Sequence, residues 1–262
     1  MDDNINLKVL HINNAVSKTI KNNENIQVLH ITNYSDCDCD CICIDQFKNL
    51  KELYINNTSV GDEQIKNCTK LQMLKLMHSS VTDVNHLTDL RVLLLNSHKK
   101  MKKEGFIQCT QIEVLDIENT CGICDINHLT NLKLLNAYGN ECKPNGEEIK
   151  NCTNLEVLSV SYDRNIHNIN HLTKLKELRA SGLCSNIRND GFQNCSKLEK
   201  IYTGNNKKIN KNQLRKGSYV AKLDTTMSEL VDRYSNKIER NINHQYFGIL
   251  DDLYFDRISD NY

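Results

Sequence analysis

The feature that most constrains the fold is a short apolar motif that recurs along the chain. The motif is Leu-x-x-Leu-x-Leu, with other apolar residues accepted and Thr203 closing the tenth copy. Successive copies begin 19 to 24 residues apart, at Leu7, Ile26, Leu50, Leu71, Leu90, Ile112, Leu132, Leu155, Leu175 and Leu198. A period of this length, held over ten copies, is typical of a solenoid in which one structural unit is stacked on the next.

Each copy of the motif predicts one short strand. The Leu-x-Leu alternation places every second side chain on the same face of a strand, so one face is apolar. A strand this short cannot bury that face alone. Neighbouring copies are therefore expected to stack into a parallel sheet with one continuous core.

Ten such motifs at a period of about 21 residues resemble the leucine-rich repeat family over residues 7–206. The resemblance implies an α/β solenoid with a curved parallel β-sheet on its concave side. Short helices, 3-10 turns and loops would form the convex side. We expect residues 1–213 to form this solenoid of about ten repeats, and residues 214–262 to form a degenerate last rung and a helical C-terminal cap or tail.

A second period of 41 to 43 residues alternates two kinds of segment before the leucine motif. One kind contains Cys68, Cys109, Cys152 or Cys195, and the other contains His86, His128 or His171. These resemble cysteine-containing and internalin-like repeats, respectively. Cysteine-type repeats resemble those of ubiquitin-ligase substrate receptors, but the first motif begins at Leu7, so we expect no F-box before it.

The regular cysteines and histidines invite a zinc hypothesis, which the spacing of a sheet opposes. Equivalent residues two rungs apart are about 10 Å apart, whereas a disulfide needs Cα atoms within about 7 Å and zinc needs sulfur at about 2.3 Å. We therefore predict that each cysteine is a buried apolar plug. Each histidine is predicted to satisfy backbone polar groups at a turn, and no metal or other cofactor is expected.

A separate cysteine cluster occurs in the segment "SDCDCDCICID" from Ser35 to Asp45, with Cys37, Cys39, Cys41 and Cys43 one residue apart. The repeat containing it is four or five residues longer than its counterparts, so the run is an expected insertion before Ile44. A neutral loop, a soft-cation site and a redox-labile disulfide stay open as interpretations. Usual structural zinc pairs are two to four residues apart, which this spacing does not match.

Composition limits the partners and the compartment. The 33 basic and 33 acidic residues balance, so the net charge gives no general attraction to nucleic acid or to an anionic membrane. No apolar run approaches the ~20 residues of a membrane span, and the start lacks the pattern of a signal peptide. We expect a cytoplasmic protein with its cysteines as thiols. The abundance of Asn, Lys and Ile indicates an AT-rich genome, such as that of a protist or a large virus.

The candidate binding surface follows from strand alternation. The third, fifth and seventh residues of each motif are expected to point out of the concave face. At mid-sheet they form an apolar patch with charges toward both ends, which is typical of a protein-binding surface. The alternative is that the valines at the third position of the motifs reflect strand propensity alone. The predicted protein-binding residues are Met73, Met77, Val92, Leu94, Val114, Asp116, Leu134, Tyr138, Val157 and Arg179.

Two lysine-rich loops offer a rival interpretation. One contains Lys99, Lys100, Lys102 and Lys103, and the other contains Lys207, Lys208, Lys211, Arg215 and Lys216. Such clusters can bind phosphate backbones weakly, but neither has aromatic residues for base stacking. The sequence also lacks a glycine-rich phosphate loop, HExxH and GxSxG. We therefore predict a non-enzymatic scaffold that binds a protein partner of unknown identity through its concave sheet, with weak nucleic-acid binding through the lysine-rich loops as the less favoured alternative.

The C-terminal segment departs from the repeat. Thr226 and Glu229 match a capping box that starts a helix, with Met227, Leu230, Val231, Tyr234 and Ile238 on one face. The segment "HQYFGILDDLYFDRI" is a second amphipathic stretch. We expect these helices to cap the last open edge of the solenoid. The alternative is a docking tail for self-association or assembly.

Overall fold

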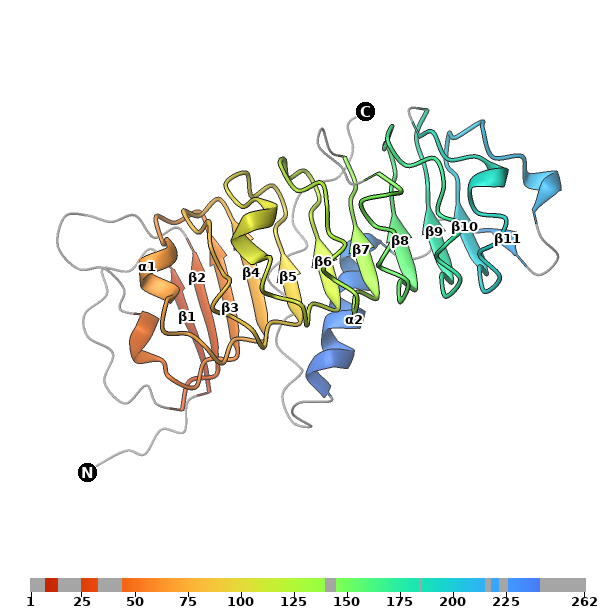
Figure 1. Cartoon of the computed structure of the whole chain (residues 1–262). Helices are drawn as coiled ribbons and strands as arrows, with labels where there is room; N and C mark the ends of the chain where they lie inside the picture. Colours follow the sequence, from red (N-terminus) through yellow and green to blue (C-terminus); the bar gives the residue numbers. More distant parts are fainter. Residues whose placement is uncertain are drawn as a thin grey trace, which may run out of the picture.

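The computed structural model describes residues 8–13, 25–32, 44–139, 145–183, 185–214, 218–221 and 226–240. Its strands form one parallel sheet in the order of the sequence (Figure 1). The strands are β1 (Val9–Asn13), β2 (Val28–Thr32), β3 (Glu52–Asn56), β4 (Met73–Met77), β5 (Val92–Leu94), β6 (Val114–Asp116), β7 (Leu134–Asn136), β8 (Val157–Ser159), β9 (Glu177–Arg179), β10 (Lys200–Tyr202) and β11 (Tyr219–Val220).

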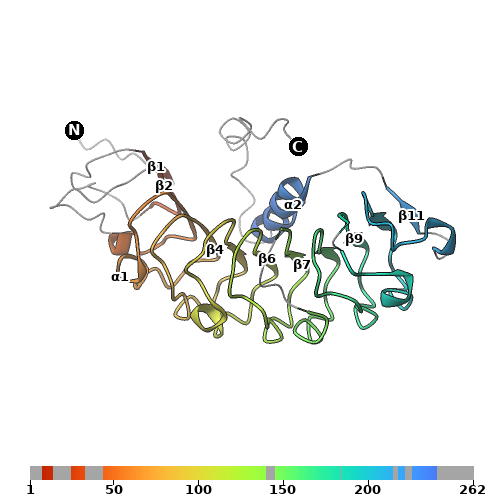
Figure 2. The same ribbon diagram turned by 90° about the horizontal axis from the view of Figure 1, so that it is seen from above.

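The sheet is the concave side of an arc, as Figure 2 shows from above. The return arms form the convex side, and they carry α1 (Asp62–Ile65) and the 3-10 turns η1 (Ile44–Gln46), η2 (Lys103–Phe106), η3 (Asn189–Gly191) and η4 (Lys211–Gln213). This architecture confirms the expected solenoid. β11 lies beside β10, in the segment expected to hold a degenerate last rung. None of the helices in the described ranges has the length and hydropathy needed to cross a bilayer.

Strand register stacks identical motif positions on one another. The fourth residue of each motif pairs with the fourth residue of the motif on the neighbouring strand. With Val220 of β11, these residues form a row of Leu10, Leu29, Leu53, Leu74, Leu93, Leu115, Leu135, Leu158, Leu178, Ile201 and Val220. A slip of one residue would turn this row out of the core, so burial fixes the register. The alternate positions then face the concave side.

The periodic cysteines are buried thiols that donate hydrogen bonds to the preceding repeat. Burial raises the pKa of Cys109, Cys152 and Cys195 to about 12, so these thiols keep their protons. Each Sγ lies 3.2 to 3.4 Å from a backbone oxygen, in the pairs Cys109 with Val84, Cys152 with Ile126 and Cys195 with Ile169. This confirms that they are buried plugs, and it adds a hydrogen bond that the sequence reasoning missed.

Two of the three periodic histidines contact backbone oxygens as predicted, whereas neither ring nitrogen of His128 has a hydrogen-bond partner within the ranges that the structure describes, and its ring lies 5.5 Å from that of Phe106. Nε2 of His86 is 3.0 Å from the Ile65 oxygen, and that of His171 is 3.3 Å from the Ile149 oxygen. Among the described residues, no group of three or more His, Cys, Asp or Glu side chains is placed to hold a metal ion. The Asp-Cys run lies outside the described residues, but Ile44 directly after it is fully buried like its repeat counterparts.

The asparagine of each histidine-containing segment links two repeats. Nδ2 of Asn127 donates to the Glu147 oxygen, and its Oδ1 accepts from the Asn151 backbone N–H, both at 2.9 Å. Asn85 and Asn170 make the equivalent pair of bonds. One amide side chain thus satisfies a donor and an acceptor of the next convex turn, because an amide offers both groups.

We expect Asn127→Ala to lower the free energy of unfolding by about 1–3 kcal/mol, since two backbone groups lose their partners. Asn151→Ala is the matched control, because its side chain is exposed and only its backbone N–H takes part. Chemical denaturation of both variants measures the difference. Equal stability of the two would show that the asparagine bridge contributes nothing.

Candidate protein-binding surface

The concave side of β4 to β8 carries a row of apolar side chains that form one cluster. We call this row the concave patch, and it consists of Met73, Val92, Leu94, Val114, Leu134 and Val157. The cluster is distinct from the solenoid core, which lies on the other face of the same strands. The structure thus brings together six of the predicted binding residues, as the alternation of the strands requires.

The concave patch is covered by the C-terminal helix α2 (Met227–Arg240), which crosses the sheet at β6 and β7 (Figure 2). Leu230 and Val231 are buried in the same cluster, and Met227 and Tyr234 pack against it. The patch residues are consequently 7% exposed or less. The expectation of an exposed apolar patch is therefore corrected: the chain supplies its own apolar cover.

Helix α2 begins where the sequence predicts. The Glu229 N–H donates to Thr226 Oγ1 at 3.1 Å, and the Thr226 N–H donates to Glu229 Oε2 at 2.7 Å, which is the reciprocal capping box. The buried face consists of Met227, Leu230, Val231, Tyr234 and Ser235. This spacing confirms the predicted amphipathic helix. The side chain of Ile238 lies outside the described residues.

The location of α2 differs from the expected cap on the last open edge. The helix packs on the centre of the concave sheet because the patch residues there match its apolar face. Burying two side chains fully and two partly contributes roughly 5–8 kcal/mol before the cost of ordering the helix. The second amphipathic stretch, within residues 241–262, lies outside the described residues.

The other predicted binding residues are distributed differently. Met77 is half-buried, and Tyr138 is 37% exposed with its ring edge-on to Tyr162 at 5.5 Å. Arg179 is buried, donates to Glu177 at 2.8 Å and lies over the Tyr202 ring. Met77 and Tyr138 therefore present surface on the concave side, whereas Arg179 is taken up by internal contacts.

Asp116 is a buried carboxyl at the C-terminal end of β6. Its oxygens accept from Asn96 Nδ2 at 3.0 Å, from Asn136 Nδ2 at 3.1 Å and from the Glu118 N–H at 2.9 Å. Burial, together with the charge of Glu118, raises its pKa to about 6 although these donors oppose the change. Asp116 thus acts as an internal anchor of the strand ends.

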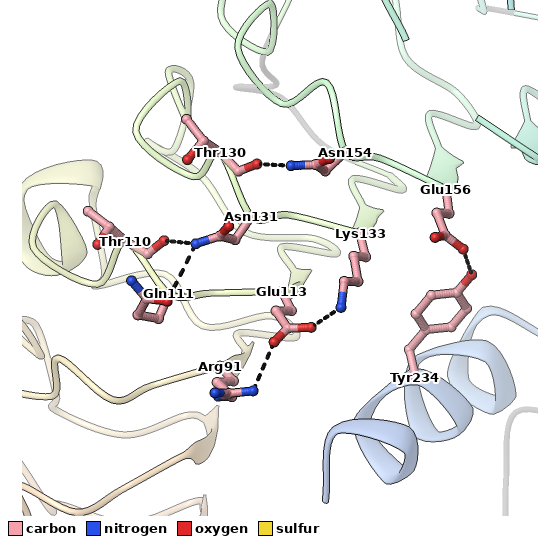
Figure 3. A network of polar contacts seen from close by, with 10 residues as sticks. All are labelled: Arg91, Thr110, Gln111, Glu113, Thr130, Asn131, Lys133, Asn154, Glu156 and Tyr234. Atoms are coloured by element: carbon pink, nitrogen blue, oxygen red, sulfur yellow. Dashed lines mark hydrogen bonds and ion pairs between the residues drawn. The ribbon is translucent and has the colours of Figure 1, made fainter. Parts of the chain in front are cut away.

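A ladder of alternating charge borders the concave patch, and the sequence reasoning missed it. The second residue of each motif alternates in sign from Arg91 through Glu113, Lys133, Glu156 and Lys176 to Glu199. Arg91 and Lys133 both pair with Glu113 (Figure 3). Lys176 pairs with Glu156 at 2.8 Å. Reading one motif position down the repeats would have found this ladder.

Helix α2 joins the charge ladder through one hydrogen bond. The Tyr234 hydroxyl donates to Glu156 Oε2 at 3.2 Å (Figure 3). Burial and the charges of Glu156 and Glu177 raise the pKa of Tyr234, so its hydroxyl stays a donor. This directional bond favours one position of α2 along the strand direction, which apolar contacts alone do not determine.

The N-terminal part of the concave side carries stacked rings. The ring centroids of His11 and His30 are 4.3 Å apart, and those of His30 and Tyr54 are 4.1 Å apart. Burial, with the charges of His11 and Lys75, lowers the pKa of His30 to about 4, so its imidazole is neutral near pH 7. Tyr54 also packs against the concave patch, which makes the aromatic row continuous with it.

The solenoid described above resembles solved structures of other proteins. No protein-family model matches the sequence, and a search of curated proteins found no match. Among solved structures, the complex of Latrophilin 3, Unc5D and the LRR part of FLRT2 contains a chain that matches with a TM-score of 0.54 and 16% identity, over 73% of this chain and 72% of that one. The chain has the leucine-rich repeat fold.

A second leucine-rich repeat structure, an internalin (inlF) from Listeria monocytogenes, matches with a TM-score of 0.48 and 18% identity. The match covers 77% of this chain and 58% of the internalin, so this chain spans little more than half of that protein. At 16% identity and a TM-score of 0.54, the FLRT2-complex match establishes the fold alone.

Three of the described lysines of the two basic loops contact a neighbouring repeat. Lys103 pairs with Asp125 at 2.7 Å, Lys100 donates to Ser80 at 3.0 Å, and Lys208 donates to Asn186. Arg215 and Lys216 lie outside the described residues. These contacts link Lys100 and Lys208 to the preceding repeat and Lys103 to the following one.

We expect Asp116 to make stability depend on pH. Its pKa of about 6 in the folded chain exceeds the ordinary 3.8, so its contribution is fully present below about pH 3.8 and is lost as pH rises through 6. The gap corresponds to about 3 kcal/mol. The stability of Asp116→Asn relative to wild type should therefore grow by about that amount between pH 4 and pH 7.5.

Denaturant unfolding at both pH values measures this difference, in which the remaining titrating groups cancel to first order. Asp89→Asn is the matched control because Asp89 is exposed. A stability difference between Asp116→Asn and wild type that stays constant with pH would contradict the raised pKa.

Proposed function

We propose that this protein is a non-enzymatic protein-binding module and that its partner docks on the concave sheet. The observation that carries the proposal is α2 itself, because the concave patch buries an amphipathic helix. A surface that accepts a helix of its own chain has the shape and polarity to accept another polypeptide. Helix-in-groove contacts of this kind are a recurring mode of protein recognition.

The surroundings of the patch support the same proposal. Protein interfaces have an apolar centre and a polar rim, and here the charge ladder from Arg91 to Glu199 borders the apolar row. The aromatic row of His11, His30 and Tyr54 extends the surface toward the N-terminal repeats. The neutral ring of His30 and the ring of Tyr54 suit stacking with partner side chains rather than attraction of charge.

Site-specific photo-crosslinking tests where the partner binds. A benzophenone amino acid is placed at Met77, Tyr138 or His11 on the concave side, and at Asn151 or Thr173 on the exposed convex side as matched controls. These positions are half-buried or exposed, so the solenoid core is untouched. After irradiation in a lysate of the source cell, the crosslinked proteins are identified by mass spectrometry.

We expect one protein to be crosslinked from at least two concave positions and from neither convex control. The crosslinking positions then identify the surface that the partner contacts, because benzophenone reacts only with groups in direct contact. Crosslinks that arise from the convex positions alone would contradict a concave binding site. Crosslinks of equal yield from both sides would do the same.

A further inference from the structure

Helix α2 is an accessory to the solenoid rather than a part of its core. The described core cluster runs from Ile12 to Ile209 and contains no residue of α2. Strands β4 to β8 pair with one another in full register beneath the helix. The core packing and the strand pairing of the solenoid therefore involve no described residue of the helix.

One face of α2 packs on the sheet. In the described part of the helix, that face makes apolar contacts through Met227, Leu230 and Val231 and a hydrogen bond from Tyr234. The opposite face is exposed and charged, with Glu229, Asp232, Arg233 and Lys237. The capping box closes the helix start with residues of the helix itself, so α2 carries its own initiation signal into any environment.

We propose that α2 holds the place of a partner's helix, and that an amphipathic helix of the partner replaces it on the concave patch. This inference rests on the proposed function and names the chemistry of the partner segment. The fitting segment has apolar residues at the spacing of Met227, Leu230, Val231 and Tyr234, with a small residue next to the last. A hydroxyl or basic group beside Glu156 completes the match.

The tether makes α2 an internal competitor. A helix joined to β11 through residues 221–226 has an effective concentration on the order of 1 mM at the patch. A partner helix therefore binds only when its affinity exceeds this competition, or when α2 is released first. Met73 at the edge of the patch can adapt to different side chains, since methionine is flexible and polarizable.

The test uses a fluorescein-labelled peptide of residues 226–240 and three forms of the full-length chain. Wild type has α2 in place. Leu230→Asp with Val231→Asp releases the tethered helix, and a third form adds Val114→Asp to spoil the patch. Fluorescence anisotropy should show binding to the released form about tenfold or more tighter than to wild type, and loss of binding to the third form.

A matched control separates release from a change in charge. Arg233→Ala alters the exposed face of α2, and this variant should bind the peptide as weakly as wild type does. If the double aspartate variant does not fold, Leu230→Ala replaces it. In wild type itself, the amides of α2 should exchange with deuterium about a hundredfold faster than those of β6 and β7.

Two results would overturn the proposal. One is equal peptide affinity for wild type and the released form, or binding to neither. The other is a dimer of wild type at micromolar concentration that Leu230→Asp abolishes, because a second copy would then be the occupant. If the peptide test fails but crosslinks still form from the concave positions, the helix-replacement inference is wrong and the proposed function stands. If no crosslinks form from the concave positions, the proposed function is wrong as well.

Discussion

In-register parallel pairing of like with like is the constraint on which the rest of the molecule depends. Each core leucine pairs with the leucine of the next repeat, so a single burial preference is repeated along the whole sheet. The same register aligns every other motif position. Apolar residues at the third position become a patch, and charges at the second position become a ladder of alternating sign. The concave patch and the charge ladder are thus consequences of the register that the core sets.

Polar groups of the convex turns are handled by the same repetition. A parallel solenoid has to satisfy the backbone of one return arm per repeat, and buried polar groups without partners are costly. Asn127, His171 and Cys152 each satisfy a group of a neighbouring repeat. The two alternating types of repeat are therefore two solutions to one backbone problem, which explains the period of two repeats.

Local patterns made most of the fold predictable from the sequence. The leucine spacing indicated the strands, and Thr226 with Glu229 indicated the start of α2. The resting place of α2 was not predictable in this way, because it depends on contacts between Val231 and residues such as Val114 that lie far apart in the chain. The patch was identified correctly as apolar, but sequence alternation describes a face and cannot say what covers it. Burial of Arg179 was missed for the same reason.

The cover also changes how the patch has to be understood. A row of valines on a concave sheet is consistent with strand propensity, and in that case the row needs no ligand. Here Met73 and Leu134 stand in the same row as the valines, and the described apolar side chains of the helix that packs on this row all lie on the matching face. Strand propensity explains one surface, but it does not explain complementarity between two. The concave patch and helix α2 are therefore complementary surfaces within one chain. The opposite face of α2 is exposed and charged, so the helix has one face suited to the patch and one suited to water, and it is not a core helix.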